Sequence, residues 1–173
     1  MKKIFCNAFF LIIFNIGASL IAYKSYSQTL RFVNHWKLPK LLHEVSGIEY
    51  EEGKIFFIND SGGRNSIYYA DAQQLTKGRR LTLKHIVDSA LTNHDWEDLA
   101  SGEDGELYVG DFGNNANSRH NLAIYITEMD SSSSSKNLIP SVLTFRYPDQ
   151  KEFPPPPSNW NYDCEAFLYY HDS

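Results

Sequence analysis

Short apolar, aromatic-rich stretches alternate with polar turn signals along most of this chain, and a six-residue motif introduces three of these stretches. The motif spans His43 to Ile48, His94 to Leu99 and Tyr162 to Phe167. The last residues of successive copies lie 51 and 68 residues apart. Internal repetition on this scale is typical of modular β-arrays, so the pattern predicts an all-β protein built from repeated sheets.

Each of the first two copies leads into four predicted strands. A β-hairpin comes first, because Glu52-Gly53 in one copy and Asp104-Gly105 in the other are turn signals flanked by strand-forming residues. A third and a fourth strand follow, at about 66–71 and 80–87 in the first copy and at about 122–128 and 141–147 in the second. Four antiparallel strands per repeat are the anatomy of a propeller blade, so we expect a β-propeller.

The likeness between the first two copies extends past the motif. Ile48 and Leu99 are each followed twelve residues later by an aspartate, Asp60 or Asp111, and fourteen residues later by a glycine. These shared offsets predict that the two aspartates occupy equivalent places.

The blade pattern also divides the chain. We expect blade 1 at about 43–88, blade 2 at about 93–147, a Pro-rich linker at 148–159 and the start of blade 3 at 160–173. Because the third copy stops where its first hairpin should form, we interpret the chain as an N-terminal fragment of about two and a half blades. A predicted strand at about 29–37 could complete the last blade of a closed ring.

The first 27 residues are expected to lie outside the propeller. Lys2 and Lys3 precede a nearly continuous apolar stretch at 4–22, and small residues follow it near Ser25. This pattern predicts a signal peptide, and therefore a secreted, periplasmic or cell-envelope protein. The apolar stretch is longer than most signal peptides need, so an uncleaved membrane anchor at residues 4–22 remains the alternative.

Charge excludes one class of partner. The chain carries 16 basic and 21 acidic residues, a net charge of -5, and removal of residues 1–27 takes away three lysines and no acids. A clustered basic surface, which nucleic acid binding requires, is absent from the sequence. Cys164 would be the only cysteine left after cleavage, so no disulfide within the chain is expected.

The motif carries the candidate chemistry. Its acidic positions in the second and third copies are Asp95, Glu97, Asp98, Asp163 and Glu165. The innermost strands of a propeller converge beside one channel, so these carboxylates should meet there. Carboxylates brought together favour a bound cation, and calcium suits them because it accepts six to eight oxygen ligands in flexible geometry. The sequence therefore predicts a calcium site.

Other interpretations of the same residues stay open. Acidic residues before a strand also cap turns, so the repeat could conserve a cap without any metal. Glu97 and Asp98 are neighbours and should point to opposite faces of a regular strand, which argues against both being ligands. His43 and His94 occupy the same place in two copies, but no nucleophile accompanies them, and we expect a structural role.

The stretch from Asp95 to Ala100, followed by Leu107 to Asn115, resembles the signature of a group of secreted bacterial β-propeller proteins of largely unknown activity. Glu97-Asp98-Leu99 before a glycine turn is also similar to the six-bladed calcium-dependent lactonases and esterases of the paraoxonase and regucalcin type. This resemblance implies six blades in the complete protein and a metal-ligand role for Glu97, Glu165 and Asp98.

Two classes of function are therefore expected. The first is an exported binding or scaffolding module for a small molecule, a glycan or another protein, with a structural calcium ion. The second is a calcium-dependent hydrolase of esters, lactones or phosphoesters, in which the cation would polarise the bound oxygen. A membrane partner is expected only if the N-terminal segment is retained.

Overall fold

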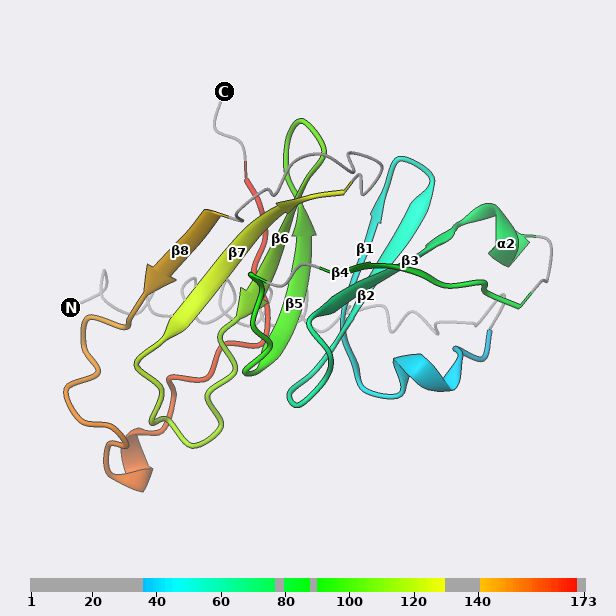
Figure 1. Ribbon diagram of the computed structural model, residues 1–173. Coiled ribbons are helices and arrows are strands. Elements are labelled where there is room, and N and C mark those ends of the chain that lie inside the picture. Colours follow the sequence, from blue (N-terminus) through cyan, green and yellow to red (C-terminus); the bar gives the residue numbers. More distant parts are fainter. Residues whose placement is uncertain (1–35, 77–79, 88–89, 130–140, 171–173) are drawn as a thin grey trace, which may run out of the picture. The chain divides into compact units, whose positions relative to one another are not determined.

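The computed structural model describes residues 36–76, 80–87, 90–129 and 141–170. These residues form two four-stranded antiparallel sheets with very little helix (Figure 1). The all-β class predicted from the sequence is thereby confirmed. The predicted signal peptide or anchor at 1–27 and nearly all of the strand expected at 29–37 lie outside the described residues. No helix among the described residues is long and apolar enough to cross a membrane.

The first sheet follows the first motif copy and has the order β1-β2-β3-β4. Its strands are β1 (Val45–Glu51), β2 (Lys54–Asn59), β3 (Ser66–Asp71) and β4 (Lys84–Val87). The hairpin between β1 and β2 turns at Glu52 and Gly53, which have φ angles of 48° and 76°. Two residues with positive φ are what a type I′ hairpin turn requires, and glycine adopts that conformation without strain. Two short helices flank this sheet, η1 (Lys40–Leu42) and α2 (Gln73–Thr76).

The second sheet follows the second motif copy and has the order β5-β6-β7-β8. Its strands are β5 (Trp96–Ser101), β6 (Glu106–Asp111), β7 (Leu122–Glu128) and β8 (Ser141–Phe145). Asp104 and Gly105 form its first turn with φ angles of 52° and 80°. A short helix η2 (Pro157–Asn159) follows, and the third motif copy runs on without forming a strand within the described residues.

The sequence predicted the third strand of each repeat at the observed residues, and it predicted the fourth strands too long. The structure begins β4 at Lys84 rather than near residue 80, and it ends β8 at Phe145 rather than at residue 147. Leu81 is buried against the first sheet outside any strand. Because Leu81 is apolar and buried, it resembles a strand residue in the sequence pattern, and the predicted fourth strand of the first sheet was therefore too long.

The main core lies between the two sheets. Its members are Phe56, Ile58, Ile67 and Ile86 from the first sheet, Trp96, Leu99, Leu107, Val109, Ala123 and Tyr125 from the second, and Leu91 and Met129 from outside the strands. Strands β1 and β5 lie next to one another across this core (Figure 1). A second, smaller cluster lies on the opposite face of the first sheet, around Phe57 and Tyr68, and η1 contributes Leu42 to it.

The two hairpins differ in length by one residue. Ile48 pairs with Phe57, nine residues later, whereas Leu99 pairs with Val109, ten residues later. At the motif end of each hairpin, Val45 therefore pairs with Asn59, and Trp96 pairs with Asp111. The predicted equivalence of Asp60 and Asp111 is thus wrong, because the structural counterpart of Asp111 is Asn59.

Candidate metal site: a carboxylate cluster at the start of β5

A bulge recurs at the same place in both sheets. The strand register shifts between Val45 and Gly47 in β1 and between Trp96 and Asp98 in β5. The extra residue is Ser46 in the first sheet and Glu97 in the second. Because a bulge interrupts the strict alternation of side chains, it can aim its residue away from the direction that a regular strand would impose.

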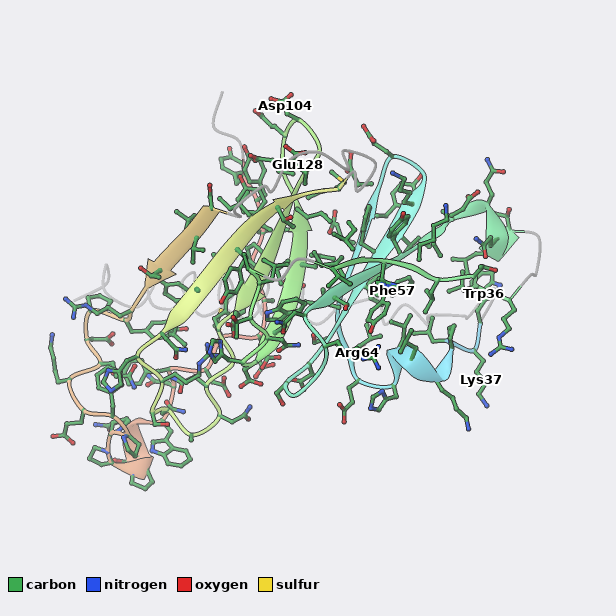
Figure 2. The ribbon with its side chains drawn as sticks, viewed as in Figure 1. Trp36, Lys37, Phe57, Arg64, Asp104 and Glu128 are labelled. Carbon is green, nitrogen blue, oxygen red and sulfur yellow. The ribbon has the colours of Figure 1, made fainter. Side chains whose placement is uncertain are left out.

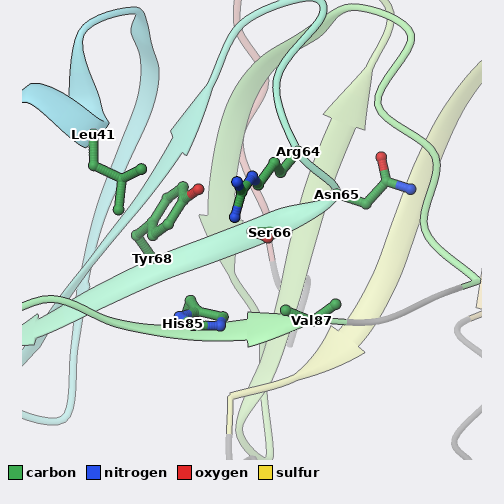
Figure 3. A pocket seen from close by; sticks show the side chains of 7 residues that line it. All are labelled: Leu41, Arg64, Asn65, Ser66, Tyr68, His85 and Val87. Atoms are coloured by element: carbon green, nitrogen blue, oxygen red, sulfur yellow. The ribbon is translucent and has the colours of Figure 1, made fainter.

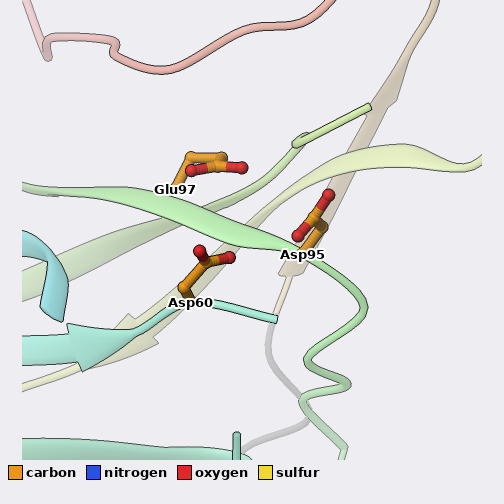
Figure 4. Close-up of side chains that lie close together, drawn as sticks. All are labelled: Asp60, Asp95 and Glu97. Carbon is orange, nitrogen blue, oxygen red and sulfur yellow. The ribbon is translucent and has the colours of Figure 1, made fainter. Parts of the chain in front are cut away.

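Five carboxylates gather beside the bulge of β5. Asp60, Asp95 and Glu97 form one triad, and Glu97, Asp163 and Glu165 form a second; within each triad the ligand oxygens all lie within 4.8 Å of one another. Figure 4 shows Asp60, Asp95 and Glu97 converging from two separate segments. We call these five residues the acidic cluster. Glu97 belongs to both triads and is therefore its centre.

Glu97 is the most buried member of the acidic cluster, with 7% of its surface exposed. Among the described residues, no hydrogen-bond donor contacts its carboxylate. Burial, followed by repulsion from Glu165, Asp60, Asp95 and Asp163, raises the pKa of Glu97 from 4.5 to about 8. A proton or a cation is therefore needed to stabilise this carboxylate near neutral pH.

Asp95 responds to the same surroundings. Burial raises the pKa of Asp95, and both the charge of Asp60 and a hydrogen bond with it act in the same direction. Arg119 opposes this shift through its positive charge. The Arg119 side chain donates to the backbone oxygens of Gly113 and Asp111, so its charge is held near the cluster without entering either triad.

Gly113 lies directly against two members of the acidic cluster. A Cβ atom added there would lie 2.1 Å from Oε1 of Glu97 and 2.5 Å from both Cγ and Oδ2 of Asp95. The Gly113 backbone N–H also donates to the Asp95 backbone oxygen at 3.1 Å. The chain after β6 therefore forms the floor on which these two carboxylates rest, and a side chain at this point would displace them.

Asp98 has different partners. One carboxylate oxygen accepts a hydrogen bond from the backbone N–H of Leu99 at 2.9 Å, and the other accepts one from the backbone N–H of Phe167 at 3.0 Å. Asp98 is in neither triad. Its carboxylate joins β5 to the third motif copy, so the structure separates it from the other four acids that the sequence selected.

Asp111 is a fully buried hub of hydrogen bonds. It accepts bonds from the backbone N–H of Asp95 at 3.0 Å and from the Arg119 guanidinium group at 3.0 Å. Its second oxygen lies 2.8 Å from Nδ1 of His94 and 3.5 Å from the Tyr125 hydroxyl. Asp111 thus fixes the segment that carries Asp95 and also orients the imidazole ring of His94.

The third motif copy is held by the loop after β6. Asn114 donates through its backbone N–H to Asp163 and through its side chain to the backbone oxygen of Tyr162. Asn117 accepts a hydrogen bond from the backbone N–H of Tyr162 at 2.9 Å. The ring of Phe112 also packs edge-on against Phe167 at 5.6 Å between centroids. These contacts place Asp163 beside Glu97, although the two residues are 66 positions apart.

The sequence alone selected four of the five members of the acidic cluster and missed Asp60. Asp60 lies twelve residues after Ile48, as Asp111 lies twelve residues after Leu99, and this shared offset led to the wrong prediction that the two aspartates are equivalent. Strand alternation could have identified Asp60. Because the first hairpin is one residue shorter than the second, Asn59 takes the place of Asp111, and Asp60, the next residue, points to the opposite face. Gly113 also went unassigned, because its role depends on carboxylates from another strand.

No protein-family model, curated protein or solved structure matches this chain.

Proposed function

We propose that this chain is part of an exported β-propeller, six-bladed when complete, which serves as a binding or scaffolding module and holds calcium at the acidic cluster. Successive four-stranded sheets with the same connectivity support the propeller architecture. The function is therefore that of a rigid platform whose repeats meet at a cation.

The contacts between successive motif copies also support the propeller architecture. A Cβ atom added to Gly47 would lie 2.8 Å from the backbone nitrogen of Leu99, so the first and second copies touch directly. The equivalent residue of the second copy, Asp98, bonds to the backbone N–H of Phe167, the equivalent of Leu99. The same pair of positions thus meets twice, as expected of units arranged about a common axis.

The calcium proposal depends on one observation, which is that the carboxylate of the largely buried residue Glu97 has no hydrogen-bond donor among the described residues and is shared by two acidic triads. Calcium binds oxygen at about 2.3 to 2.6 Å, so two ligands on opposite sides of one ion lie about 5 Å apart. The spacing within each triad fits that limit. Carboxylate oxygens are also the ligands that calcium prefers.

Calcium titration of the full chain, followed by thermal unfolding, tests this proposal. We expect calcium to raise the melting temperature, because an ion that binds only the folded state stabilises it. Glu97→Gln should abolish most of that rise, since it removes the ligand common to both triads. Asp60→Asn and Asp163→Asn each remove a ligand from one triad and should weaken calcium binding less.

Glu128→Gln is the matched control. Glu128 is at the other end of the second sheet, near the turn that contains Asp104 (Figure 2). This variant should respond to calcium as the unaltered protein does. An unchanged melting temperature in millimolar calcium, with Glu97→Gln behaving like the unaltered protein, would rule out the calcium site.

A calcium-dependent hydrolase is the second candidate, and the geometry of His94 favours it. Because Asp111 is 2.8 Å from Nδ1, the ring is oriented and Nε2 is left for proton transfer. Turnover of ester, lactone or phosphoester substrates that requires both calcium and His94 would establish this activity. Binding of calcium without turnover of any of these substrates would leave the scaffolding function.

A further inference from the structure

A cavity of about 510 Å³ lies on the face of the first sheet that points away from the second sheet. It is lined by Leu41, Arg64, Asn65, Ser66, Tyr68, His85 and Val87 (Figure 3). We call it the Arg64 pocket. Neither the acidic cluster nor any residue of the third motif copy contributes to its lining, so the proposed calcium site does not account for it.

Three polar side chains of the Arg64 pocket, those of Arg64, Ser66 and Tyr68, lack partners among the described residues. Among the described residues, no hydrogen bond or ion pair involves the Arg64 guanidinium group or the hydroxyls of Ser66 and Tyr68. Ser66 and Tyr68 are 5% and 4% exposed, so both hydroxyls are on side chains that are otherwise buried. Among the described residues, the only fully buried side-chain polar atom without a partner is Oδ1 of Asn59, so both hydroxyls are accessible from the cavity and can bond to a ligand there.

Charge selects the kind of ligand. Arg64 is a permanent cation, whereas no aspartate or glutamate of the described residues lines the Arg64 pocket. In Figure 3 the Tyr68 hydroxyl points toward the Arg64 guanidinium group. The two groups can therefore donate hydrogen bonds to one anion.

The second sheet shows what such an arrangement binds. Tyr125 pairs with Val109 as Tyr68 pairs with Phe57, so the two tyrosines are equivalent. The Tyr125 hydroxyl and the guanidinium group of Arg119 both approach the carboxylate of Asp111. In the first sheet the corresponding residues are Tyr68 and Arg64, which lies in the loop between β2 and β3 as Arg119 lies in the loop between β6 and β7.

The corresponding carboxylate, however, is missing from the first sheet. The counterpart of Asp111 there is Asn59, an uncharged amide whose side chain donates to the backbone oxygen of Leu41. An arginine and a tyrosine that in the second sheet share an internal carboxylate are thus left without one in the first.

We infer that the Arg64 pocket binds a small organic carboxylate with an apolar or aromatic body. The ligand carboxylate would accept hydrogen bonds from Arg64 and Tyr68, in the role that Asp111 has in the second sheet. Leu41 and Val87 provide apolar walls for the rest of the molecule. A concave, mostly apolar cavity with a few converging donors is the usual form of a small-molecule site.

Titration of the full chain with phenylacetate, monitored by calorimetry, tests this inference. We expect saturable binding, and no binding of the uncharged analogue benzyl alcohol. The titration is carried out without calcium, so its result is independent of the proposed metal site. Inorganic phosphate is titrated in parallel, and phosphate binding that matches phenylacetate binding would contradict the requirement for an apolar body.

Two variants identify the site. Arg64→Gln should weaken phenylacetate binding by about tenfold to a hundredfold, the usual contribution of a charged hydrogen bond. Tyr68→Phe keeps the ring and removes only the hydroxyl, so it should weaken binding by about tenfold or less. Both variants are checked for an unchanged unfolding transition.

Arg146→Gln is the control, because Arg146 is another exposed arginine, located beyond β8. It should leave phenylacetate binding unchanged. No saturable binding to the unaltered protein, or equal loss in Arg146→Gln and Arg64→Gln, would overturn the inference.

Discussion

The two sheets have one topology but differ in how they use the residues at the end of the second strand. In the first sheet β2 ends at Asn59, and Asp60 then points toward the second motif copy. In the second sheet β6 ends at Asp111, which binds internally, and Phe112 then points toward the third copy. Because the second hairpin is one residue longer than the first, the side chain that faces the next motif copy is Phe112 in the second sheet and Asp60 in the first.

Burial differs between the sheets for a related reason. Ile48 and Leu99 hold the same motif position, but Ile48 is 57% exposed and Leu99 is 2% exposed. Leu99 is covered because the first sheet packs over it, as part of the core between the sheets. The burial of a motif residue is therefore determined by whether another sheet packs over it, and not by its position in the motif.

Removing the internal carboxylate should have the largest effect on this comparison. Asp111→Ala leaves Arg119, His94 and the Asp95 N–H without their shared partner, so we expect the free energy of unfolding to fall by about 3 to 5 kcal/mol. The matched change in the first sheet, Asn59→Ala, removes one hydrogen bond and should cost about 1 kcal/mol. Urea denaturation measures both. Similar losses in the two variants would contradict the distinct role of Asp111.

Stability without calcium should depend on pH through Glu97. The pKa of Glu97 is raised by folding from 4.5 to about 8, so the folded state binds this proton more tightly than the unfolded state. Its contribution is complete below pH 4.5 and is lost as the pH rises through about 8. In a chelating buffer we therefore expect Glu97→Gln to melt several degrees above the unaltered protein at pH 8.5.

At pH 5 this difference in melting temperature should be much smaller, because Glu97 then carries a proton. A difference between the two proteins that does not change with pH would show that Glu97 ionises normally. Calcium should compete with the same proton, so its affinity should increase over this pH range.

Gly113→Ala should weaken calcium binding at the acidic cluster while changing the stability of the fold only slightly. The new methyl group would meet the ends of two flexible side chains, so we expect a loss of stability of only about 1 kcal/mol. Glu97 and Asp95 must move to accommodate it, and calcium affinity should fall tenfold or more. Gly62→Ala is the comparison in the first sheet: it has open space but a φ of 71°, so it should lower stability and leave calcium binding unchanged.

Ser46→Ala should have the smallest effect. The Ser46 hydroxyl donates to the backbone oxygen of Trp96 at 2.7 Å, which links the first bulge to the second sheet. Loss of this bond should lower the free energy of unfolding by about 1 kcal/mol. Thermal unfolding at saturating calcium measures it. A loss above about 3 kcal/mol would show that the first bulge contributes more than this single bond.

Much of the fold followed from local signals in the sequence. Turn residues with positive φ at Glu52-Gly53 and Asp104-Gly105 defined both hairpins, and β-branched and aromatic residues marked the third strands at the observed positions. The ends of the fourth strands were less predictable, because residues such as Leu81 are buried by tertiary contacts outside any ladder.

The candidate site was predictable only in part. Repetition of the motif selected Asp95, Glu97, Asp163 and Glu165, which the structure brings together. Asp98 shares their chemistry, but the backbone N–H groups of Leu99 and Phe167 occupy its oxygens. Such a distinction depends on a bulge and on contacts between residues about 70 positions apart, and a sequence pattern carries neither.

The recurring bulge has a consequence for how this protein could diversify. Ser46 and Glu97 are the extra residues of their strands, so neither is constrained by the pairing that fixes its neighbours. Substitution at this point alters which chemical group a repeat contributes, while the hairpin that carries it keeps its register.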